Sequence, residues 1–287
     1  MAFSESERKK KFFYATELNA GMYDATVDFV VPQYKNMHDV MIDLMDRSFR
    51  QVAQTSMSSC STVALEIGSG TGALSIPLLG KFPLSKLVAV DFSPPMNILF
   101  RKSFAAAFPS EDIDSRVRFV EADILGEHGR PESLRSVLAE FTNGLNSSFD
   151  AVVTALTLHH FERAEKMEVY TRMFRVLKSQ GLLLNGDLFS YESRHLTDFA
   201  KNFDVTWIKE KFEARAVAVE SAGESKDLDS KTASDWRRLG SLWQKHYEED
   251  NLLDSTEIQE LMLRFTGFRH TGVPFRFWEG GILWGQK

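Results

Sequence analysis

The sequence predicts an α/β protein built on a doubly wound, mostly parallel sheet. Short β-rich runs alternate with helical patterns five times between residues 62 and 190, and parallel strands need such crossover connections. A glycine-rich turn in VALEIGSGTGALS, residues 63–75, joins the first strand to the first helix. Two β-rich runs at the end of the chain flank the residues WEGG and predict an antiparallel hairpin.

The first patterned element precedes the sheet. Residues 36–49 place six apolar side chains on one face at helical spacing, namely Met37, Val40, Met41, Leu44, Met45 and Phe49. This pattern predicts an amphipathic helix that docks on the core. Residues 12–34, before this helix, are rich in aromatic side chains. We therefore predict an N-terminal helical lid and docking segment over residues 1–61.

The sheet core is predicted over residues 62–190. The elements alternate as strand 62–67, helix from 71, strand 86–92, helix after 93–96, strand 116–124, helix after 129–134, strand 149–156, helix 163–177 and strand 181–189. Pro77 falls inside the first of these helices, and proline lacks the donor that a helix interior needs. We expect a kink or a shift of frame there.

The alternation of strands and helices stops after the fifth strand. Residues 191–250 hold aromatic helical patterns around a polar stretch, which predicts a helical cap insertion. We expect most of its aromatic residues to form the core of the cap: Phe199, Phe203, Trp207, Phe212, Trp236, Trp243 and Tyr247. Residues 251–287 then supply a capped helix that ends near Gly267, and the hairpin that completes the core.

Composition narrows the classes of function. The 287 residues are 43% hydrophobic and 26% charged, as in ordinary globular proteins, and the formal net charge is -6. A net negative charge gives no broad attraction to phosphate, so we expect no nucleic acid partner. No apolar run approaches twenty residues and no apolar stretch follows the basic run at 7–13, so we expect a cytoplasmic protein without membrane contact. Cys60, the one cysteine, is assigned no chemistry.

The glycine-rich turn predicts a nucleotide site. Gly68, Gly70 and Gly72 lie between a strand and a helix, where a ligand can approach the backbone without obstruction by Cβ atoms. Gly68, Gly70 and Ala73 also fit the looser pattern of dinucleotide-binding turns. However, Glu66 would place a carboxylate where a pyrophosphate would be repelled, and the loop has no basic residue. These features favour a nucleotide that carries an ammonium group.

At this point the sequence resembles the class I S-adenosylmethionine-dependent methyltransferases, whose first motif is an acid followed by alternate glycines. The resemblance implies a Rossmann-like, seven-stranded sheet with a reversed last strand, and S-adenosylmethionine as cofactor. It implies that Asp91 holds the ribose hydroxyls and that Asp123 meets the adenine amino group. The segment FDAVVTALTLHHF, residues 149–161, matches the fourth motif of the family. The implied cofactor-binding residues are Glu66, Gly68, Gly70, Gly72, Asp91, Phe92, Asp123, Ile124 and Thr154.

Candidate substrate and catalytic residues lie outside the glycine turn. His159 and His160 could serve as a general base or as packing residues; because adjacent side chains at a strand end should diverge, we expect no metal site. The N-terminal segment is predicted either to close over the cofactor or to be an apolar strap on the sheet edge. Residues predicted to face the substrate are Tyr14, Tyr23, Tyr34, Arg194, Arg237 and Arg238, the arginines as anchors for an anionic group.

The resemblance implies methyl transfer to a small-molecule acceptor by direct in-line displacement. The fourth motif lacks the [DN]-P-P-[FY] signature of enzymes that methylate amino groups of nucleic acid bases. The flanks at 27–45 and 251–268 also resemble carboxy-S-adenosylmethionine synthases. The synthase holds its extra carboxylate with an arginine of the insertion. In the corresponding stretch of this sequence, Lys231, Arg237 and Arg238 do not reproduce the synthase motif. A synthase-like enzyme, a nucleoside-modifying enzyme and a non-catalytic regulatory protein therefore remain as alternatives, with a homodimer as one option for assembly.

Overall fold

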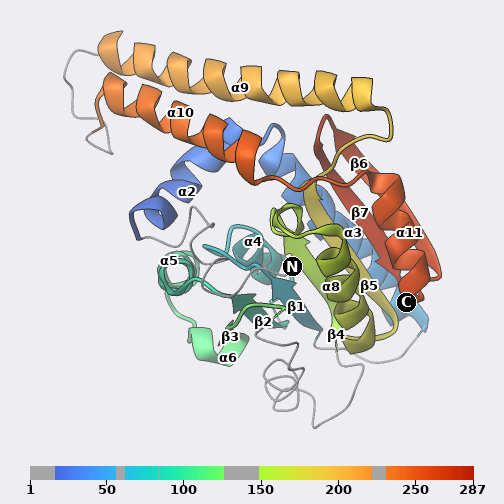
Figure 1. The fold of residues 1–287 in the computed structure, drawn as a ribbon. Helices are drawn as coiled ribbons and strands as arrows, with labels where there is room; N and C mark the ends of the chain where they lie inside the picture. The colour runs from blue at the N-terminus through green and yellow to red at the C-terminus, as the bar shows by residue number, and fades with distance from the viewer. Residues whose placement is uncertain (1–16, 56–61, 84, 126–148, 222–230) are drawn as a thin grey trace.

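A computed structural model describes residues 17–55, 62–83, 85–125, 149–221 and 231–287 of the chain. The helix expected after 129–134, the basic run at 7–13, Tyr14 and Cys60 lie outside the described residues. Figure 1 shows one sheet flanked by helices, with two long helices stacked across one end of it.

The sheet has the order β3-β2-β1-β4-β5-β7-β6. Its first five strands are parallel, and β7 runs antiparallel to both β5 and β6. This arrangement confirms the expected seven-stranded α/β fold with a reversed last strand. The bounds are β1 Val63–Ile67, β2 Lys86–Asp91, β3 Val117–Glu121, β4 Phe149–Ala155, β5 Leu177–Leu188, β6 His270–Phe277 and β7 Gly280–Gln286.

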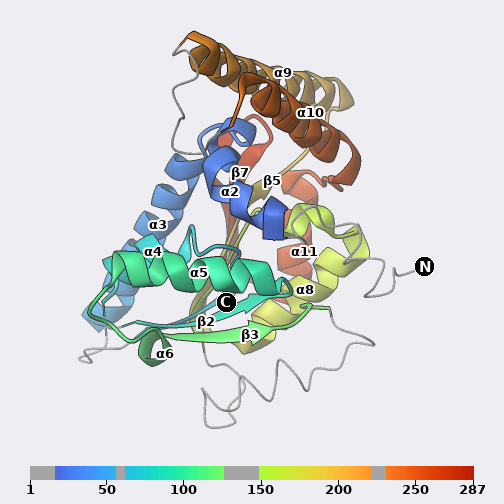
Figure 2. The same cartoon turned by 90° about the vertical axis from the view of Figure 1, so that its left-hand side faces the viewer.

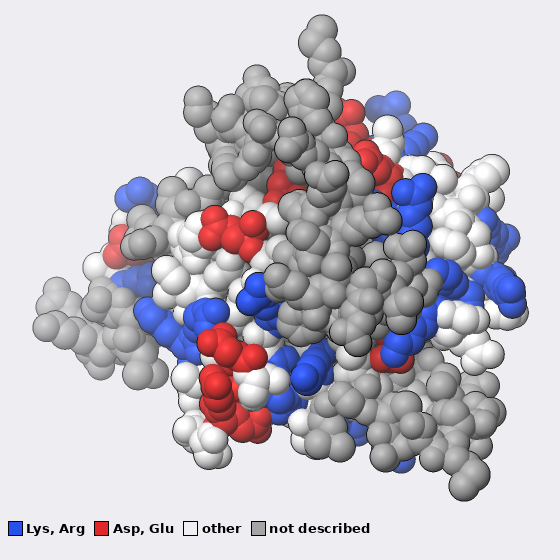
Figure 3. Space-filling view, turned by 90° about the horizontal axis from the view of Figure 1, so that it is seen from below, with Lys and Arg blue, Asp and Glu red and all other residues white. Residues whose placement is uncertain are grey.

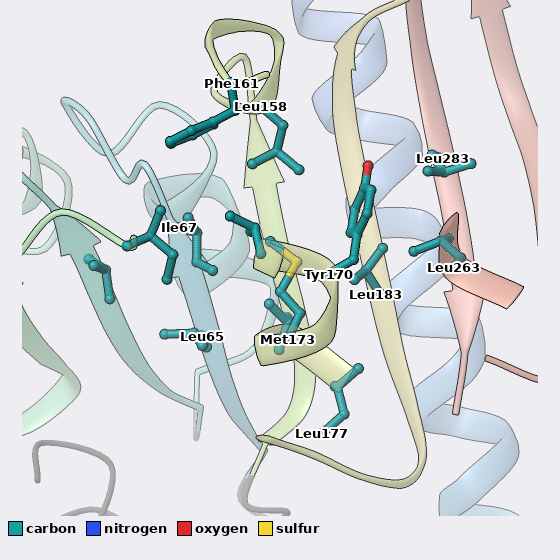
Figure 4. Packing of buried hydrophobic residues seen from close by; sticks show 14 of the residues in the cluster. Leu65, Ile67, Leu158, Phe161, Tyr170, Met173, Leu177, Leu183, Leu263 and Leu283 are labelled. Atoms are coloured by element: carbon teal, nitrogen blue, oxygen red, sulfur yellow. The ribbon is translucent and has the colours of Figure 1, made fainter. Parts of the chain in front are cut away.

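Helices cover both faces of the sheet. On one face, α8 (Arg163–Val176) and α11 (Thr256–Thr266) bury Tyr170, Met173 and Leu263 against strand residues such as Leu65 and Leu183 (Figure 4). The opposite face is covered by α3 (Tyr34–Thr55), α4 (Ser75–Lys81) and α5 (Pro94–Ala107); the short α6 (Ile113–Arg116) precedes β3. A 3-10 turn, η3 (Leu158–His160), follows β4.

The expected docking helix is α3, and its methionines explain why it lies so close to the sheet. Met37, Met41 and Met45 are at most 1% exposed and pack on β4, β5 and β7. A Cβ at Gly186 would lie 2.5 Å from the Met41 sulfur, so the absence of a side chain in β5 allows this approach.

Pro77 does not lie in a helix interior, where we expected a kink or a shift of frame. The helix α4 begins at Ser75, not at Thr71, so the proline lies in its first turn. Backbone N–H groups in a first turn have no partner within the helix, and proline is tolerated there. By contrast, α11 ends as expected, with Gly267 in the left-handed conformation at a φ of 114°.

The insertion after β5 folds as two helices, α9 (Arg194–Ser221) and α10 (Ala233–Asp250), which lie along one another above the sheet (Figure 1). Helix α2 (Glu17–Val30) lies between this pair and the sheet core (Figure 2). Val27 and Val30 of α2 share one apolar cluster with Phe212, Trp236 and Trp243 of the two long helices. The N-terminal segment and the cap are therefore packed into a common core.

Of the expected cap aromatics, Phe212, Trp236, Trp243 and Tyr247 are buried, whereas Phe199 is 59% exposed. None of the described helices is long and apolar enough to cross a bilayer. On the face of the molecule shown in Figure 3, the described lysines and arginines lie among aspartates and glutamates, so the visible charge is mixed.

Candidate active site

A pocket lies beyond the carboxyl ends of β1, β2 and β4, where parallel sheets of this kind bind ligands. Its floor is the end of β1 and the loop at 68–74. Its walls come from the segments that follow the other strands, at 90–93, 122–124, 155–157 and 160–161. Tyr23 of α2, Tyr34 and His38 of α3, and Met96 of α5 complete the lining.

The three glycines of the loop all have positive φ, but for different reasons. A Cβ on Gly70, with φ 52°, would meet no atom within 4 Å, so its backbone faces open space in the pocket. A Cβ on Gly68 would collide with Thr157, and one on Gly72 would lie 2.7 Å from Phe100 of α5. Gly72 does not line the pocket. Its predicted contact with the cofactor is therefore not supported, and its role is to let α5 pack.

Asp91, at the end of β2, is 7% exposed and is fixed by two backbone donors. Gly70 N donates to its Oδ2 and Ser93 N to its Oδ1, each at 2.8 Å. Burial raises the pKa of this carboxyl to about 6, although the two N–H groups oppose the shift. Because each carboxylate oxygen has a second lone pair, Asp91 can still accept hydrogen bonds from a bound molecule.

Glu66 lines the pocket but differs from the charged group that the sequence argument assumed. Its side chain is 1% exposed and accepts a hydrogen bond from the Ser75 hydroxyl. Burial raises its pKa to about 8, and the nearby Asp91 acts in the same direction. The neutral form is therefore favoured at pH 7 without ligand, and repulsion of pyrophosphate by Glu66 is a weaker argument than we expected.

The other implied cofactor residues divide into two groups. Phe92, Asp123 and Ile124 line the pocket, and Asp123 Oδ1 is oriented by the backbone N–H of Leu125 at 2.9 Å. Thr154 lies inside β4, is 0% exposed and does not line the pocket. The structure therefore does not bring Thr154 to the other predicted residues, because the strand continues for one more residue before the chain reaches the pocket.

The two histidines lie together, contrary to the expectation that they diverge. The 3-10 turn places their ring centroids 3.9 Å apart. His160 lines the pocket, whereas His159 lies behind it, with Nδ1 2.5 Å from Asp187 Oδ1. Burial lowers the pKa of His160 well below its usual range, and the neighbouring His159 and His246 add to this effect. Within the described ranges, no cluster of His, Cys, Asp and Glu could hold a metal ion.

Helix α2 is connected to both the glycine loop and the cap. Thr71 Oγ1 donates to Asp24 Oδ1 at 2.5 Å, and Trp243 Nε1 of α10 donates to Thr26 Oγ1 at 3.0 Å. On the same helix, Tyr23 lines the pocket and its hydroxyl is hydrogen-bonded to that of Tyr34. Two of the three predicted tyrosines are therefore pocket residues, and α2 covers the site.

Sequence reasoning missed His38. It is 6% exposed, lines the pocket, and its ring centroid lies 4.3 Å from that of Tyr34. The available signal was spacing: His38 follows Tyr34 by four residues, so both lie on the same side of α3. We predicted that helix from its methionines and did not examine the polar residues beside them.

The three predicted arginines do not reach the pocket. Arg194, Arg237 and Arg238 are exposed on the outer sides of α9 and α10. Arg237 pairs with Glu213 at 2.8 Å and with Glu220 at 2.7 Å, so its charge joins the two long helices to one another. No described residue of the pocket lining is a lysine or an arginine. The expected anchoring of an anionic group by these arginines is therefore not supported.

The sequence profile of a methyltransferase domain matches residues 65–183, which include the glycine loop, Asp91, Asp123 and both histidines. This match identifies a methyltransferase domain within the chain and agrees with the resemblance to the class I S-adenosylmethionine-dependent methyltransferases. The cofactor that this resemblance implies is S-adenosylmethionine. The pocket fits it, because Gly70 offers unobstructed backbone and buried carboxyl groups are available for hydroxyl and ammonium donors.

The chain is similar to a demethylmenaquinone methyltransferase of Thermus thermophilus, at 27% identity over 54% of the chain; the match spans 60% of the relative's length. The structure of a putative S-adenosylmethionine-dependent methyltransferase from Methanococcus maripaludis aligns with 100% of the chain. The alignment spans 97% of the Methanococcus protein, with a TM-score of 0.50 and 17% identity. The structure of an O-methyltransferase family protein from Burkholderia thailandensis aligns with 87% of the chain. The alignment spans 58% of the Burkholderia protein, with a TM-score of 0.49 and 17% identity. At these identities the structural likeness concerns the fold alone.

Proposed function

We propose that the protein transfers the methyl group of S-adenosylmethionine to a small, uncharged acceptor. The observation that carries this proposal is the pocket itself, in which the unobstructed backbone of Gly70 and the fixed carboxyl of Asp91 lie under the cover of α2. When bound, the cofactor supplies an electrophilic methyl group on a sulfonium. The protein then needs to align the acceptor and exclude water.

The roles of the cofactor-binding residues follow from their placement. Asp91 is preorganised by Gly70 and Ser93, so it can accept two hydrogen bonds from vicinal hydroxyls without further ordering. Asp123, fixed by the Leu125 N–H, is placed to accept from an amino group, and Ile124 supplies apolar contact beside it. Helices α2 and α3 exclude water above these residues, because Tyr23 of α2 and Tyr34 of α3 line the pocket.

His160 is the residue that we assign to proton removal when the acceptor carries a proton. It lines the pocket, and its lowered pKa leaves the imidazole neutral at physiological pH, as a base must be. His159 and Asp187 act behind it: their 2.5 Å contact fixes the ring on which His160 packs. A thiolate or a thioether acceptor would need no base.

The charge of the lining limits the acceptor. The described lining holds acidic residues and histidines with lowered pKa values, but no lysine or arginine. A carboxylate or phosphate near the reacting atom would therefore lack a partner and would lose its hydration. The same argument disfavours carboxy-S-adenosylmethionine synthesis, because the extra carboxylate of that product needs a cation.

Mass spectrometry of the nucleotide that copurifies with the protein tests the cofactor, and a screen for release of S-adenosylhomocysteine tests the reaction. The panel would contain phenols, quinols, thiols and amines, each with and without a carboxylate. We expect S-adenosylmethionine or its demethylated product, and turnover with uncharged members only. Asp91→Ala should lose cofactor binding and turnover together. A carboxylated cofactor, or turnover only with anionic acceptors, would contradict the proposal.

A further inference from the structure

His38 stands out among the buried polar groups because it lines the pocket and still has an atom without a partner. Its side chain is 6% exposed, and its Nε2 has no hydrogen-bond partner among the described residues. A buried polar atom left in this state costs about 1–3 kcal/mol. Such an atom in a pocket is accounted for most simply by a bound molecule that completes it.

The His38 ring is held in place from two sides. It packs against Tyr34 with the ring centroids 4.3 Å apart and the rings tilted, and Tyr34 is itself hydrogen-bonded to Tyr23. The ring also donates to the main-chain carbonyl of Ala73, within the loop that follows β1. This bond to Ala73 leaves Nε2 as the nitrogen without a partner. The position of Nε2 is therefore fixed before any ligand binds.

Nε2 of His38 is a hydrogen-bond acceptor. Burial lowers the pKa of the imidazole to about 4, even though the bond to Ala73 and the charge of Asp28 oppose the shift. The ring is therefore neutral at physiological pH, and Nε2 offers a lone pair. The missing partner is accordingly a hydrogen-bond donor.

The surroundings favour a positively charged donor. The described lining contains the carboxyl groups of Asp91 and Asp123, but no lysine or arginine that would repel a cation. A hydrogen bond from an ammonium group is roughly twice as strong as one between neutral groups. A cation beside His38 also keeps the imidazole neutral. His38 is anchored to Ala73, three residues beyond Gly70, so it belongs to the cofactor side of the pocket.

We propose that His38 Nε2 accepts a hydrogen bond from the ammonium group of the amino-acid part of S-adenosylmethionine, so that His38 is a cofactor-binding residue supplied by α3. This inference rests on the proposed function for the identity of the cofactor, but not on the identity of the acceptor. It assigns to the N-terminal helices a direct contact with the cofactor in addition to covering it.

The test compares three ligands by calorimetric titration without turnover. They are S-adenosylhomocysteine, its analogue without the amino group, and 5′-methylthioadenosine, which lacks the whole amino-acid part. His38→Phe should weaken S-adenosylhomocysteine about tenfold or more, as expected for losing a bond to a charged group. The other two ligands should bind within twofold of the wild type. Their binding also shows that the variant is folded.

Two further variants complete the design. His38→Gln keeps an acceptor at the same distance along the side chain and should restore most of the affinity for S-adenosylhomocysteine. His270→Phe makes the same chemical change at an exposed residue of β6 and should leave all three affinities unchanged. In protein labelled with ¹⁵N-histidine, only the ligand that carries the ammonium group should shift the His38 Nε2 resonance.

The inference is wrong if His38→Phe weakens all three ligands equally, or none of them. It is also wrong if the Nε2 resonance moves only when a methyl acceptor is added, since the donor would then belong to the acceptor. If the wild-type protein binds neither S-adenosylhomocysteine nor 5′-methylthioadenosine, the cofactor assignment itself fails. These outcomes separate failure of the inference from failure of the proposed function.

Discussion

Single glycines in the loop after β1 have separate functions that their spacing does not reveal. Gly70 leaves open space in the pocket, where we propose that the ligand binds, whereas Gly72 leaves space that Phe100 fills. Gly68 leaves space for Thr157, which follows β4. In this motif of alternate glycines, one glycine therefore leaves room for a ligand, and the other two let neighbouring side chains pack against the loop.

Alanine at these positions should separate the two requirements. Both Gly70→Ala and Gly72→Ala put a side chain at positive φ, which costs roughly 1–2 kcal/mol. Only Gly72→Ala also forces a Cβ to 2.7 Å from Phe100. We expect Gly72→Ala to lower the melting temperature more, and Gly70→Ala to weaken S-adenosylhomocysteine by tenfold or more. Thermal unfolding and calorimetric titration of both variants would measure this, and the reverse order would contradict our assignment.

Glu66 should make the stability of the ligand-free protein depend on pH. Because burial raises its pKa from 4.5 to about 8, the native state retains a proton that the unfolded chain releases. The contribution of this proton to the free energy of unfolding is fully present below pH 4.5 and is lost as the pH rises through about 8. Glu66→Gln has no proton to lose.

Urea unfolding of both proteins between pH 4.5 and 9 would measure this contribution. The free energy of unfolding of the wild type, relative to Glu66→Gln, should fall across the window and become level above about pH 8. The exposed Glu192→Gln serves as control and should give no such slope. A difference that does not change with pH would show that Glu66 is ionised in the folded protein.

At the level of elements, the cap is joined to the sheet by a buried polar cluster. The Tyr247 hydroxyl of α10 lies 2.9 Å from Asp204 Oδ2 of α9 and is also bonded to Glu279 in the turn between β6 and β7. A hydroxyl has one hydrogen to donate, so the second bond requires a protonated carboxyl. Burial meets this requirement, since it raises the pKa of Asp204 to about 7 and raises that of Glu279.

Removing the Tyr247 hydroxyl should loosen this junction. Tyr247→Phe leaves two buried carboxyl groups without their shared partner, and we expect a loss of about 1–3 kcal/mol in the free energy of unfolding. Ser241→Ala removes an exposed hydroxyl from the same helix, and we expect a change within about 0.5 kcal/mol. Urea unfolding at pH 7 would compare them. Equal stability of Tyr247→Phe and wild type would show that the cluster does not hold the cap.

The spacing of apolar residues predicted the helices well. It did not predict what the polar residues of those helices contact. The apolar pattern of residues 36–49 correctly indicated α3, because burying methionines requires helical spacing. Arg237 has the same local pattern whether it faces a pocket or a neighbouring helix. Its partners Glu213 and Glu220 come from α9, and no local pattern specifies how two helices turn toward each other.

For the whole molecule, the sheet was predictable because strand ends, glycine turns and crossover helices are local signals that the topology then combines. Glu66, Asp91 and Asp123 could be predicted as pocket residues for the same reason, since parallel strands end at one edge. The contact of His38 with the pocket and the packing of His160 against His246 could not, because they depend on how α3 and α10 pack over that edge. The sequence therefore predicted the floor of the pocket well and its cover poorly.

The two hydrogen bonds that hold α2 also bear on how the chain folds as it is synthesised. Asp24 bonds a residue 47 positions later in the chain, and Thr26 bonds one 217 positions later. When α2 leaves the ribosome, neither partner has been made, and the second is not available until most of the protein has been translated. Contacts between such distant residues form late in folding. We therefore expect the helix that is made first among those described to reach its final place only after α10 has been made, and until then the pocket of the nascent sheet is uncovered.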